Sequence, residues 1–399
     1  MKKVLLISQN FYPEIGSAAN RMKYVFQTLS MTHQVTLITT EPGYPNQNLY
    51  REDQFWEEQL DEKDVIRIKV RTKNYTRNIM KRFLFYLEIM LQFIRAILKQ
   101  KKTVDVIYIS TPPISVGIAG LFAKSFLKAR LIVEVRDLWP EALVGINRWN
   151  KPWLLRLAYM LEKRIYRRAD EIIVNSEGFV DYIVGKGIAK EKIHFVPNSL
   201  TERELKVGAK LKKEHLKEEY TVIYAGNIGL AQEMEDFFDM AERFQKDPKV
   251  QFKIFGYGFR LEEAKKQLLD RNLTNITILC PQNRSFVLEE IKKADIAYVT
   301  LVDHPVFETV LPGKIIDYMG MGIPIIGNVS GYSDEVIRNA GCGYTYQHGE
   351  TDAMCARLKQ LMENATLCSQ LGKNGHAYVC ENHRWATNFQ RIEGIVNRG

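Results

Sequence analysis

The chain has 399 residues, of which 46% are hydrophobic and 26% are charged, so it is long enough for two globular domains. Its five cysteines are far apart with no C-x-x-C motif, and its seven histidines form no H-x-x-x-H pair, so neither disulfides nor a structural metal is supported. No run reaches eighteen apolar residues, and no membrane-spanning helix is predicted. These features favour a cytoplasmic protein with reduced thiols.

The net charge of +9 is concentrated in one segment. Residues 67–102 carry eleven Lys/Arg and one acid, Glu88, which gives this segment a net charge of +10 and the remainder of the chain −1. The basic character therefore belongs to one part of the chain and needs its own explanation.

In the first half, apolar runs alternate with helical patterns. The start, MKKVLLISQN, has an apolar run of only four residues before Ser8, which indicates a first strand rather than a signal peptide. Strands are predicted at 4–8, 34–40, 65–70, 104–110, 131–137, 171–176 and 193–198, with helices at about 18–30, 78–100, 114–128, 152–168 and 177–185. This order predicts a parallel sheet covered on both faces.

The second half repeats this organisation after a charged segment. Residues 199–220 have almost no large apolar side chains, and strands follow at 221–226, 250–256, 275–281, 295–301, 323–328 and 342–346. In the tail, Trp385, Phe389, Ile392 and Val396 recur at helical spacing. The predicted parts are a first domain at 1–198, a linker at 199–220, a second domain at 221–380 and a final helix at 381–399.

The Leu-Pro-Gly-Lys sequence in the second half predicts a binding site. Pro312 and Gly313 favour a helix start, where free amides and the helix dipole attract a phosphate and Lys314 adds a positive charge. Glu308 and Asp317 are placed to accept hydrogen bonds from sugar or ribose hydroxyls. A sugar joined to a diphosphate fits these groups, and an ordinary loop with solvated acids is the alternative.

Glycine-containing turns follow two strands of the second half. Gly226 and Asn227 end one strand, and Gly256 and Gly258 end the next. Glycine lets backbone amides approach a phosphate, and ligands of open parallel sheets bind beyond the carboxyl ends of the strands. The turns are therefore predicted to contribute to the same site, with plain connections as the alternative.

The first half offers a second set of candidates. Gly16 and Ser17 lie in a loop of small residues that opens a helix carrying Arg21, and Arg136 and Asp137 end the strand at 131–137. These residues are predicted to line a cleft opposite the phosphate site. Close helix–sheet packing and an internal Arg–Asp ion pair are the alternatives.

The basic segment 67–102 combines cations with an apolar, aromatic run. Lys81 and Arg82 lie where the two parts meet. This composition suits a helix on an anionic membrane surface. Nucleic acid is not predicted as a partner because no nucleic-acid motif is present. The other interpretation is a buried helix that follows a solvated basic loop.

Three motifs together resemble family 4 of the retaining glycosyltransferases. They are Gly-Asn-Ile-Gly-Leu-Ala-Gln at 226–232, Leu-Pro-Gly-Lys at 311–314 and Gly-Ile-Pro-Ile-Ile at 322–326. The branch that they resemble builds bacterial O-antigen and capsule repeat units and is similar to the N-acetylfucosaminyl transferases. The resemblance covers essentially the whole chain, with further agreement at 12–16, 136–141 and 196–198.

The resemblance implies the α/β fold called GT-B. Two Rossmann-like domains would face each other across a cleft, and the last helix would cross back to the N-terminal domain. The N-terminal domain would bind the acceptor, and the C-terminal domain a nucleotide-diphosphate sugar without a metal or other cofactor. By position, Glu308 would bind the transferred sugar and Asp317 would bind the ribose. The diphosphate would be held by Lys314 together with Val310, Leu311, Pro312 and Gly313. Pro281 and Gln282 would border the base.

The chain departs from the family pattern at several positions. Asn227 and Gln232 stand in the turn where much of the family has an Arg and a Lys, and Asp317 replaces a glutamate at a spacing of nine instead of eight from Glu308. Arg136 is close to a position that often holds a histidine. Lys314 and Arg136 are therefore the predicted cations for the leaving diphosphate, with Arg21 and Arg260 behind them.

The predicted function is that of a metal-independent retaining glycosyltransferase. It would move an N-acetylated sugar from a UDP-sugar to a polyprenyl-diphosphate-linked glycan, at the cytoplasmic face of the plasma membrane, which segment 67–102 would contact. Two alternatives stay open. One is an enzyme similar to UDP-N-acetylglucosamine 2-epimerase, and the other is a sugar-nucleotide-binding partner without catalytic activity.

Overall fold

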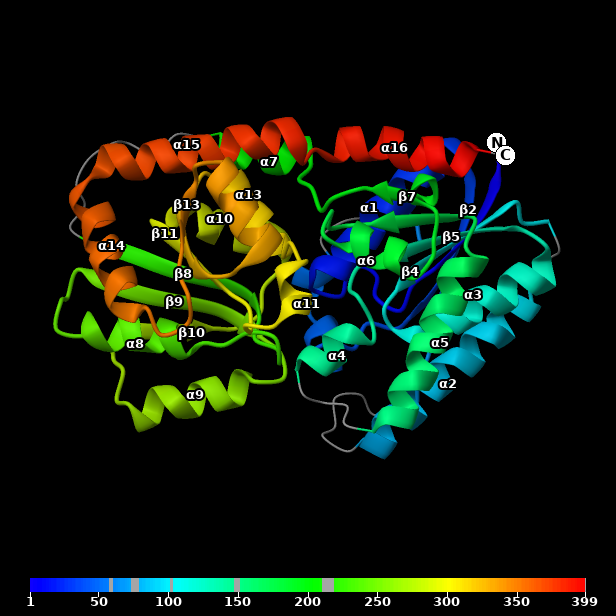
Figure 1. Cartoon of the computed structure of the whole chain (residues 1–399), viewed down its shortest axis with the longest axis horizontal. Coiled ribbons are helices and arrows are strands. Elements are labelled where there is room, and N and C mark those ends of the chain that lie inside the picture. Colours follow the sequence, from blue (N-terminus) through cyan, green and yellow to red (C-terminus); the bar gives the residue numbers. More distant parts are fainter. Residues whose placement is uncertain (57–59, 73–78, 101–102, 147–150, 210–218, 399) are drawn as a thin grey trace. The chain divides into compact units, whose positions relative to one another are not determined.

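The computed structural model divides into two compact units. It describes the chain except for residues 57–59, 73–78, 101–102, 147–150, 210–218 and 399. The first unit comprises Met1–Pro197 with Thr387–Gly399, and the second comprises Asn198–Ala386. Figure 1 shows a parallel sheet flanked by helices in each unit. The prediction of two Rossmann-like α/β domains, with the last helix returning to the first, is confirmed.

The first unit contains a parallel sheet that has seven strands within the described residues, in the order β3-β2-β1-β4-β5-β6-β7. The strands are β1 (Lys3–Ile7), β2 (Gln34–Thr40), β3 (Val65–Ile68), β4 (Val106–Thr111), β5 (Arg130–Val135), β6 (Glu171–Val174) and β7 (Ile193–Phe195). The helices are α1 (Ser17–Thr32), α2 (Ile79–Leu98), α3 (Ile114–Leu127), α4 (Glu141–Gly145), α5 (Pro152–Arg168), α6 (Phe179–Gly185) and α16 (Trp385–Asn397), with 3-10 turns η1 (Gln47–Arg51), η2 (Asp53–Trp56) and η3 (Lys190–Lys192).

The direction of each crossover decides which face a helix covers. The connections β3 to β4, β4 to β5 and β5 to β6 all run across the sheet in one direction, whereas β1 to β2 runs in the other. Because such crossovers are almost always right-handed, α2, α3 and α5 share one face and α1 lies on the opposite face. The central strands are buried by both helical layers, which explains their continuous apolar sequences.

The second unit has a parallel sheet of six strands in its described part, in the order β10-β9-β8-β11-β12-β13. They are β8 (Tyr220–Asn227), β9 (Val250–Tyr257), β10 (Ile276–Leu279), β11 (Ile296–Thr300), β12 (Ile325–Asn328) and β13 (Gly343–Thr345). The helices are α7 (Glu202–Gly208), α8 (Glu235–Arg243), α9 (Leu261–Asp270), α10 (Arg284–Lys293), α11 (Pro305–Glu308), α12 (Gly313–Gly320), α13 (Gly331–Asn339), α14 (Thr351–Glu363) and α15 (Ala365–Asn382).

The segment predicted as a linker is partly a helix of the second unit. Thr201 caps α7 in a capping box with Glu204, and Leu205 is buried. A Cβ at Gly208 would lie 1.8 Å from the carbonyl oxygen of Gly320, so glycine is needed where α7 meets α12. Because the segment is rich in charged residues, its sequence did not predict this packing. Linker residues 210–218 lie outside the described part of the chain.

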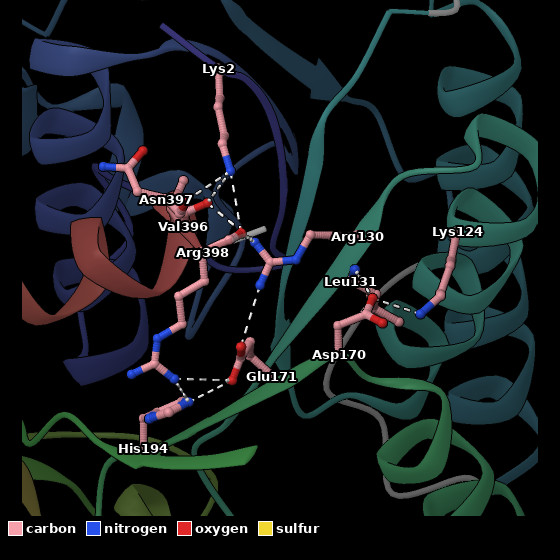
Figure 2. Close-up of polar contacts among 10 residues, drawn as sticks. All are labelled: Lys2, Lys124, Arg130, Leu131, Asp170, Glu171, His194, Val396, Asn397 and Arg398. Atoms are coloured by element: carbon pink, nitrogen blue, oxygen red, sulfur yellow. Dashed lines mark hydrogen bonds and ion pairs between the residues drawn. The ribbon is translucent and has the colours of Figure 1, made fainter. Parts of the chain in front are cut away.

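The carboxyl end of α16 is held by two cations of the first unit, as Figure 2 shows. The Lys2 Nζ donates to the carbonyl oxygens of Val396, Asn397 and Arg398 at 3.0, 3.2 and 3.3 Å. Arg130 donates to the carbonyls of Val396, at 3.3 Å, and Arg398. These carbonyls have no partner within the helix, and the helix dipole makes this end negative. The cations therefore stabilise the end of α16 on the first unit.

Glu171 of β6 connects Arg130 to His194 of the edge strand β7. Its carboxylate pairs with Arg130 at 3.4 Å, with the His194 Nε2 at 2.6 Å and with Arg398 at 3.7 Å. Farther along α16, the Asn388 side chain donates to the Pro197 carbonyl at 2.7 Å. The final helix is thus fixed to the first unit by charge at its end and by burial along its length.

No helix in the described residues has both the length and the apolar composition that crossing a bilayer requires.

Replacing Lys2 and Arg130 together with methionine should destabilise the first unit. The change removes both cations from the end of α16 and should lower the free energy of unfolding by about 1 kcal/mol, or about 2–4 °C in Tm. Thermal unfolding followed by circular dichroism measures this effect. Lys3→Met changes a neighbouring exposed lysine that bonds Thr103 instead, so it is the control. An equal Tm for the double variant and wild type would contradict the proposed clamp.

Candidate functional site

The candidate site lies in the second unit, where β8 and β11 separate. β8 pairs with β9 from Tyr220 to Asn227, but it pairs with β11 only at Val222 and Ile223. Between these two strands the order of the sheet reverses, which is where open parallel sheets bind ligands. The last residues of β8 therefore need other partners on the side that β11 has left.

Tyr318 of α12 supplies those partners. Ala225 follows Thr221 and Ile223 at the two-residue spacing of a strand, so its backbone groups point toward the side of β11. The Tyr318 hydroxyl accepts from the Ala225 amide at 2.8 Å and lies 3.3 Å from the Ala225 carbonyl, to which it donates. Tyr318 is fully buried, so this bond fixes α12 against the end of β8.

Lys314, one turn before Tyr318, reaches the same strand end. Its ammonium lies 3.9 Å from the centre of the Tyr224 ring and donates to the Tyr224 hydroxyl. That hydroxyl in turn donates to the carbonyl of Asn227 at 2.6 Å. The lysine is therefore held by a cation–π contact and a hydrogen bond at the turn that ends β8.

Gly226 leaves the space that the Lys314 side chain occupies. Gly226 has φ of +136°, and a Cβ there would lie 3.3 Å from Cε and 3.5 Å from Nζ of Lys314. A side chain at this position would be strained and would crowd the lysine. Burial lowers the pKa of Lys314 to about 7, although the Asp317 carboxylate acts in the opposite direction. The ammonium is consequently poised to gain an anionic partner.

The turn after Gly226 is braced by side chains. The Gly229 amide donates to Gln232 Oε1 at 2.9 Å, and Arg260 donates to the Gln232 carbonyl at 3.2 Å. Arg260 also pairs with Glu263 at 3.1 Å, so its charge is partly neutralised. Gln232 thus organises the turn in which the resembled family has a cation.

Glu308 stands at the end of α11 with its side chain exposed. Within the described residues its carboxylate makes no hydrogen bond or ion pair. Its backbone is close to α13, because a Cβ on Gly331 would lie 2.2 Å from the Glu308 carbonyl oxygen. Ser333 donates to the carbonyl of Val310 at 2.6 Å, which fixes the loop between Glu308 and α12.

The backbone from Val310 to Gly313 leads directly into α12. Leu311 is buried, Pro312 is the N-cap residue with ψ of 136°, and Gly313 begins the helix. No side chain caps this start, so its first amides are not satisfied by a capping group. The predicted helix start is observed one residue before Lys314.

Asp317 is engaged by an arginine that the sequence did not suggest. Arg284, the first residue of α10, pairs with the two Asp317 oxygens at 2.9 and 3.3 Å. Its Nε also pairs with Glu204 of α7 at 2.5 Å. Burial raises the pKa of Asp317, and Arg284 opposes that shift. For Glu204 the charge of Arg284 and the hydrogen bonds from Thr201 outweigh burial and lower the pKa.

The remaining donor-site candidates lie at the ends of β9 and β10. Gly256 is packed tightly, because a Cβ there would lie 2.8 Å from Ile228 Cδ1. Gly258 has φ of +120°, which only glycine adopts readily. Pro281 and Gln282 are half-buried and come directly before the start of α10. The need for glycine at position 256 is therefore explained by close packing against Ile228.

Arg21 is the clearest correction in the first unit. It is only 1% exposed, its Nε pairs with Glu134 at 2.7 Å, and it donates to the carbonyls of Val196 and Pro197 at 2.8 and 3.0 Å. Glu134 is a buried carboxylate within β5, and it requires this cation. The prediction that Arg21 lines a ligand site is wrong because its guanidinium is used in the interior.

Arg136 and Asp137 do not form an ion pair in the described part of the chain. The Arg136 guanidinium donates to Ser110 Oγ at 2.8 Å and to the Pro112 carbonyl at 2.9 Å, and Asp137 is exposed. Burial lowers the pKa of Arg136. Both charges therefore remain at the carboxyl end of β5.

The small-residue loop opens α1 as predicted. Gly16 has φ of 121° and is the N-cap residue of α1, and Ser17 is exposed. No side chain caps this start, so its first amides are not satisfied by a capping group.

The basic segment is partly outside the described residues. Residues 73–78 and 101–102 lie outside the described part of the chain. On α2, Lys81 is exposed and Arg82 is half-buried. Glu88, the one acid of the segment, accepts hydrogen bonds from the amides of Arg71 and Thr72 at 2.8 and 2.9 Å.

Among described residues there is no group of three His, Cys, Asp or Glu side chains that could hold a metal ion.

Sequence reasoning missed Tyr224, Tyr318 and Arg284. Tyr318 lies four residues after Lys314, so the two share a face of α12, and this spacing was an available signal. Arg284 is 33 residues from Asp317 in sequence, and no local pattern joins them. The three residues position Lys314 and Asp317.

Comparisons with known protein families match both units. Residues 24–199 match the family described as "Glycosyl transferase 4-like domain", and residues 209–378 match "Glycosyl transferases group 1". A relative from Escherichia coli (strain K12), the glycosyl transferase WcaI assigned to colanic acid biosynthesis, is 21% identical over 346 residues. The alignment covers 83% of this chain and 84% of WcaI. Such relatives do not favour the epimerase or the non-catalytic alternative.

Solved structures share the fold at low sequence identity. Sucrose-phosphate synthase from Thermosynechococcus elongatus has a TM-score of 0.73 at 16% identity, covering 99% of this chain and 98% of that chain. Anabaena Alr3699/HepE, solved in complex with UDP-glucose, has a TM-score of 0.71 at 14% identity and 99% coverage of both chains. These similarities concern the GT-B fold.

Replacing Arg284 with methionine should destabilise the second unit more at neutral than at acid pH. Glu204 and Asp317 would each lose their cation, at a cost of about 1–3 kcal/mol, because the three side chains are 11–28% exposed. The lowered pKa of Glu204 contributes stability above its unfolded pKa, and this contribution disappears as pH falls. In the variant, the carboxyls of Glu204 and Asp317 can both protonate near pH 4.5 and then no longer need a cation. The decrease in the free energy of unfolding caused by the substitution is therefore smaller at that pH.

Urea unfolding at neutral pH and near pH 4.5 measures this difference. Arg338→Met removes an exposed ion pair with Asp334 on α13 and is the control, with an expected loss of about 0–0.5 kcal/mol at both values. A loss for Arg284→Met that does not change with pH would contradict the assigned pairing.

Proposed function

Because the chain belongs to the family-4 glycosyltransferases, we propose that it transfers a sugar from a UDP-sugar to a lipid-linked glycan with retention of configuration. The proposed acceptor is a polyprenyl-diphosphate-linked saccharide, and the transferred sugar is N-acetylated. The pathway is the synthesis of a bacterial surface polysaccharide, of the O-antigen or capsule type. WcaI, which is assigned to colanic acid biosynthesis, supports this choice of pathway.

The placement of Lys314 is the observation that carries the proposal. Departure of a diphosphate builds negative charge, and prearranged amides and cations can stabilise that charge without a metal. Lys314 is fixed by Tyr224 beside the uncapped start of α12, at the position where β8 and β11 diverge. Burial lowers the pKa of Lys314 to about 7, so the free site disfavours the charged ammonium until an anion binds beside it.

Glu308 and Asp317 are proposed to orient the donor. The exposed Glu308 carboxylate would accept hydrogen bonds from hydroxyls of the transferred sugar. Asp317 would accept from the ribose while Arg284 holds its oxygens in place. Pro281 and Gln282, which precede Arg284, would border the base. The turn at Gly226 and Asn227, with Gly258 and Arg260, would complete the donor site.

The first unit is proposed to bind the acceptor. Arg136 and Asp137 offer one charge of each sign at the end of β5, and Gly16 and Ser17 offer the uncapped start of α1. Arg136 remains a proposed cation for the leaving diphosphate. The proposed reaction needs no cofactor, because the leaving phosphate itself helps to take the acceptor proton.

We also propose that α2 brings the enzyme to the anionic cytoplasmic surface of the membrane. Phe83 is 61% exposed, and Leu84, Leu91 and Leu98 are 48%, 44% and 50% exposed at a spacing of seven residues, which is about two turns of the helix. Buried Phe85, Ile89, Phe93 and Ile97 form the opposite, core-facing stripe. An exposed apolar stripe on a helix whose first residues include Lys81 and Arg82 fits an interfacial helix better than a buried one.

Donor binding should be coupled to proton uptake by Lys314. The bound diphosphate would raise the lowered pKa, so near pH 8 about one proton should be taken up per UDP-N-acetylglucosamine bound, and almost none near pH 6. The donor affinity should fall by up to about tenfold per pH unit above 7. Calorimetry in two buffers of different ionisation enthalpy measures the uptake.

Lys314→Arg keeps a charge that does not titrate in this range, so its binding should show no uptake at either pH. Lys265→Arg changes an exposed lysine of the same unit that pairs with Glu262, and it should behave as wild type. Equal uptake by wild type and Lys314→Arg would rule out Lys314 as the responsible group.

Glu308→Gln should slow the reaction without weakening nucleotide binding. The amide keeps the shape but weakens the interaction with sugar hydroxyls, so the rate of UDP release from a UDP-sugar should fall by about 10²-fold. The affinity for UDP alone should stay within about twofold of wild type. Asp303→Asn alters an exposed acid that precedes α11 and serves as the control. Weaker UDP binding by Glu308→Gln would place Glu308 at the nucleotide instead of the sugar.

A further inference from the structure

Helix α5 carries a second exposed apolar stripe, outside the basic segment at 67–102. Trp153 is 67% exposed, Leu157 41% and Met160 59%, and these positions recur every three or four residues on one side of the helix. The opposite side is buried through Ala158 and Ile165. Large apolar side chains at such exposure on consecutive turns indicate a surface that is covered by a partner.

The charge around this stripe has one sign. Arg156 and Arg164 are exposed between and beyond the apolar residues, and Arg167 and Arg168 follow at the end of the helix. The one acid of α5, Glu162, is only 2% exposed and pairs with Lys186 at 3.4 Å. The outer surface of α5 is therefore cationic as well as apolar.

The layer of helices makes α5 and α2 parts of one face. α3 packs against both α2 and α5, and the three helices cover the same side of the sheet (Figure 1). A Cβ on Gly117 of α3 would lie 2.5 Å from Ile165 of α5, which shows how closely these two helices approach. Between the stripes, Phe126 of α3 is 39% exposed and stacks on Phe122. Exposed apolar side chains thus occur on all three helices.

We propose that α5 docks on an anionic lipid bilayer together with α2, through Trp153, Leu157 and Met160 with Arg156 and Arg164. Apolar side chains would enter the interface while the cations meet lipid headgroups. A second copy of this chain fits the face poorly, because two cationic surfaces repel each other. This inference extends the proposed membrane contact of α2 and does not depend on the transfer reaction.

Flotation of the full chain with vesicles tests the inference. The vesicles contain phosphatidylglycerol and phosphatidylcholine in equal parts, or phosphatidylcholine alone. Wild type should bind the anionic vesicles, and Trp153→Ser/Leu157→Ser/Met160→Ser should bind at least about tenfold more weakly. Arg156→Glu/Arg164→Glu should also lose at least about tenfold, and only on anionic vesicles.

Matched controls separate the stripe from general apolar exposure. Met31→Ser on α1, on the opposite face of the sheet, and Leu269→Ser on α9 remove side chains that are each 76% exposed. Both should bind vesicles as wild type does. Lys81→Glu/Arg82→Glu tests the contact of α2 in the same assay. Binding of UDP by each variant reports an intact fold and donor site independently of the membrane.

Three results would overturn the inference. The first is wild-type affinity of the α5 triple variant for anionic vesicles while the α2 variant is weakened. The second is no vesicle binding by wild type, which removes the α2 contact as well and leaves the donor site standing if UDP still binds. The third is a change in sedimentation of the triple variant without a change in vesicle binding, which identifies a face between copies of the chain.

Discussion

The divergence of β8 from β11 after Ile223 is the constraint on which the candidate site depends. A strand end that has lost its neighbour leaves backbone groups that need a partner, and Tyr318 satisfies those of Ala225. That bond fixes α12 in position along β8, and Lys314, on the same face of the helix, is thereby placed on Tyr224. The location of the cation is thus a consequence of how the sheet opens.

How much of this site the sequence could predict follows from the range of each interaction. The start of α12 was predictable because Pro312 and Gly313 act on their own neighbours. The glycine at 226 was recognised as a strand end, but its role in admitting Lys314 depends on two segments that lie 88 positions apart in the chain. The pairing of Arg284 with Asp317 likewise required the packing of α10 beside α12.

Arg21 and Arg136 also show that the sequence does not reveal long-range pairing. Arg21 and Arg136 both looked like ligand-site cations, yet one is buried on Glu134 and the other remains at the end of β5. The signal that separates them was present: Glu134 interrupts an apolar strand, and a carboxylate in a parallel sheet interior requires a cation. What the sequence does not reveal is which of several arginines supplies it.

The sequence indicates a membrane contact for α2 but not for α5, because the two helices distribute their cations and apolar residues differently along the chain. In α2 the cations precede the apolar run, so the excess of charge stands out along the chain. In α5 cations and apolar residues alternate, and its apolar residues occur on both sides of the helix, as in a buried one. Only the exposure of each side chain divides them into Ala158 and Ile165, which face the core, and Trp153, Leu157 and Met160, which do not. A membrane surface built from several helices is therefore a property of the helical layer, and composition along a single segment underestimates its extent.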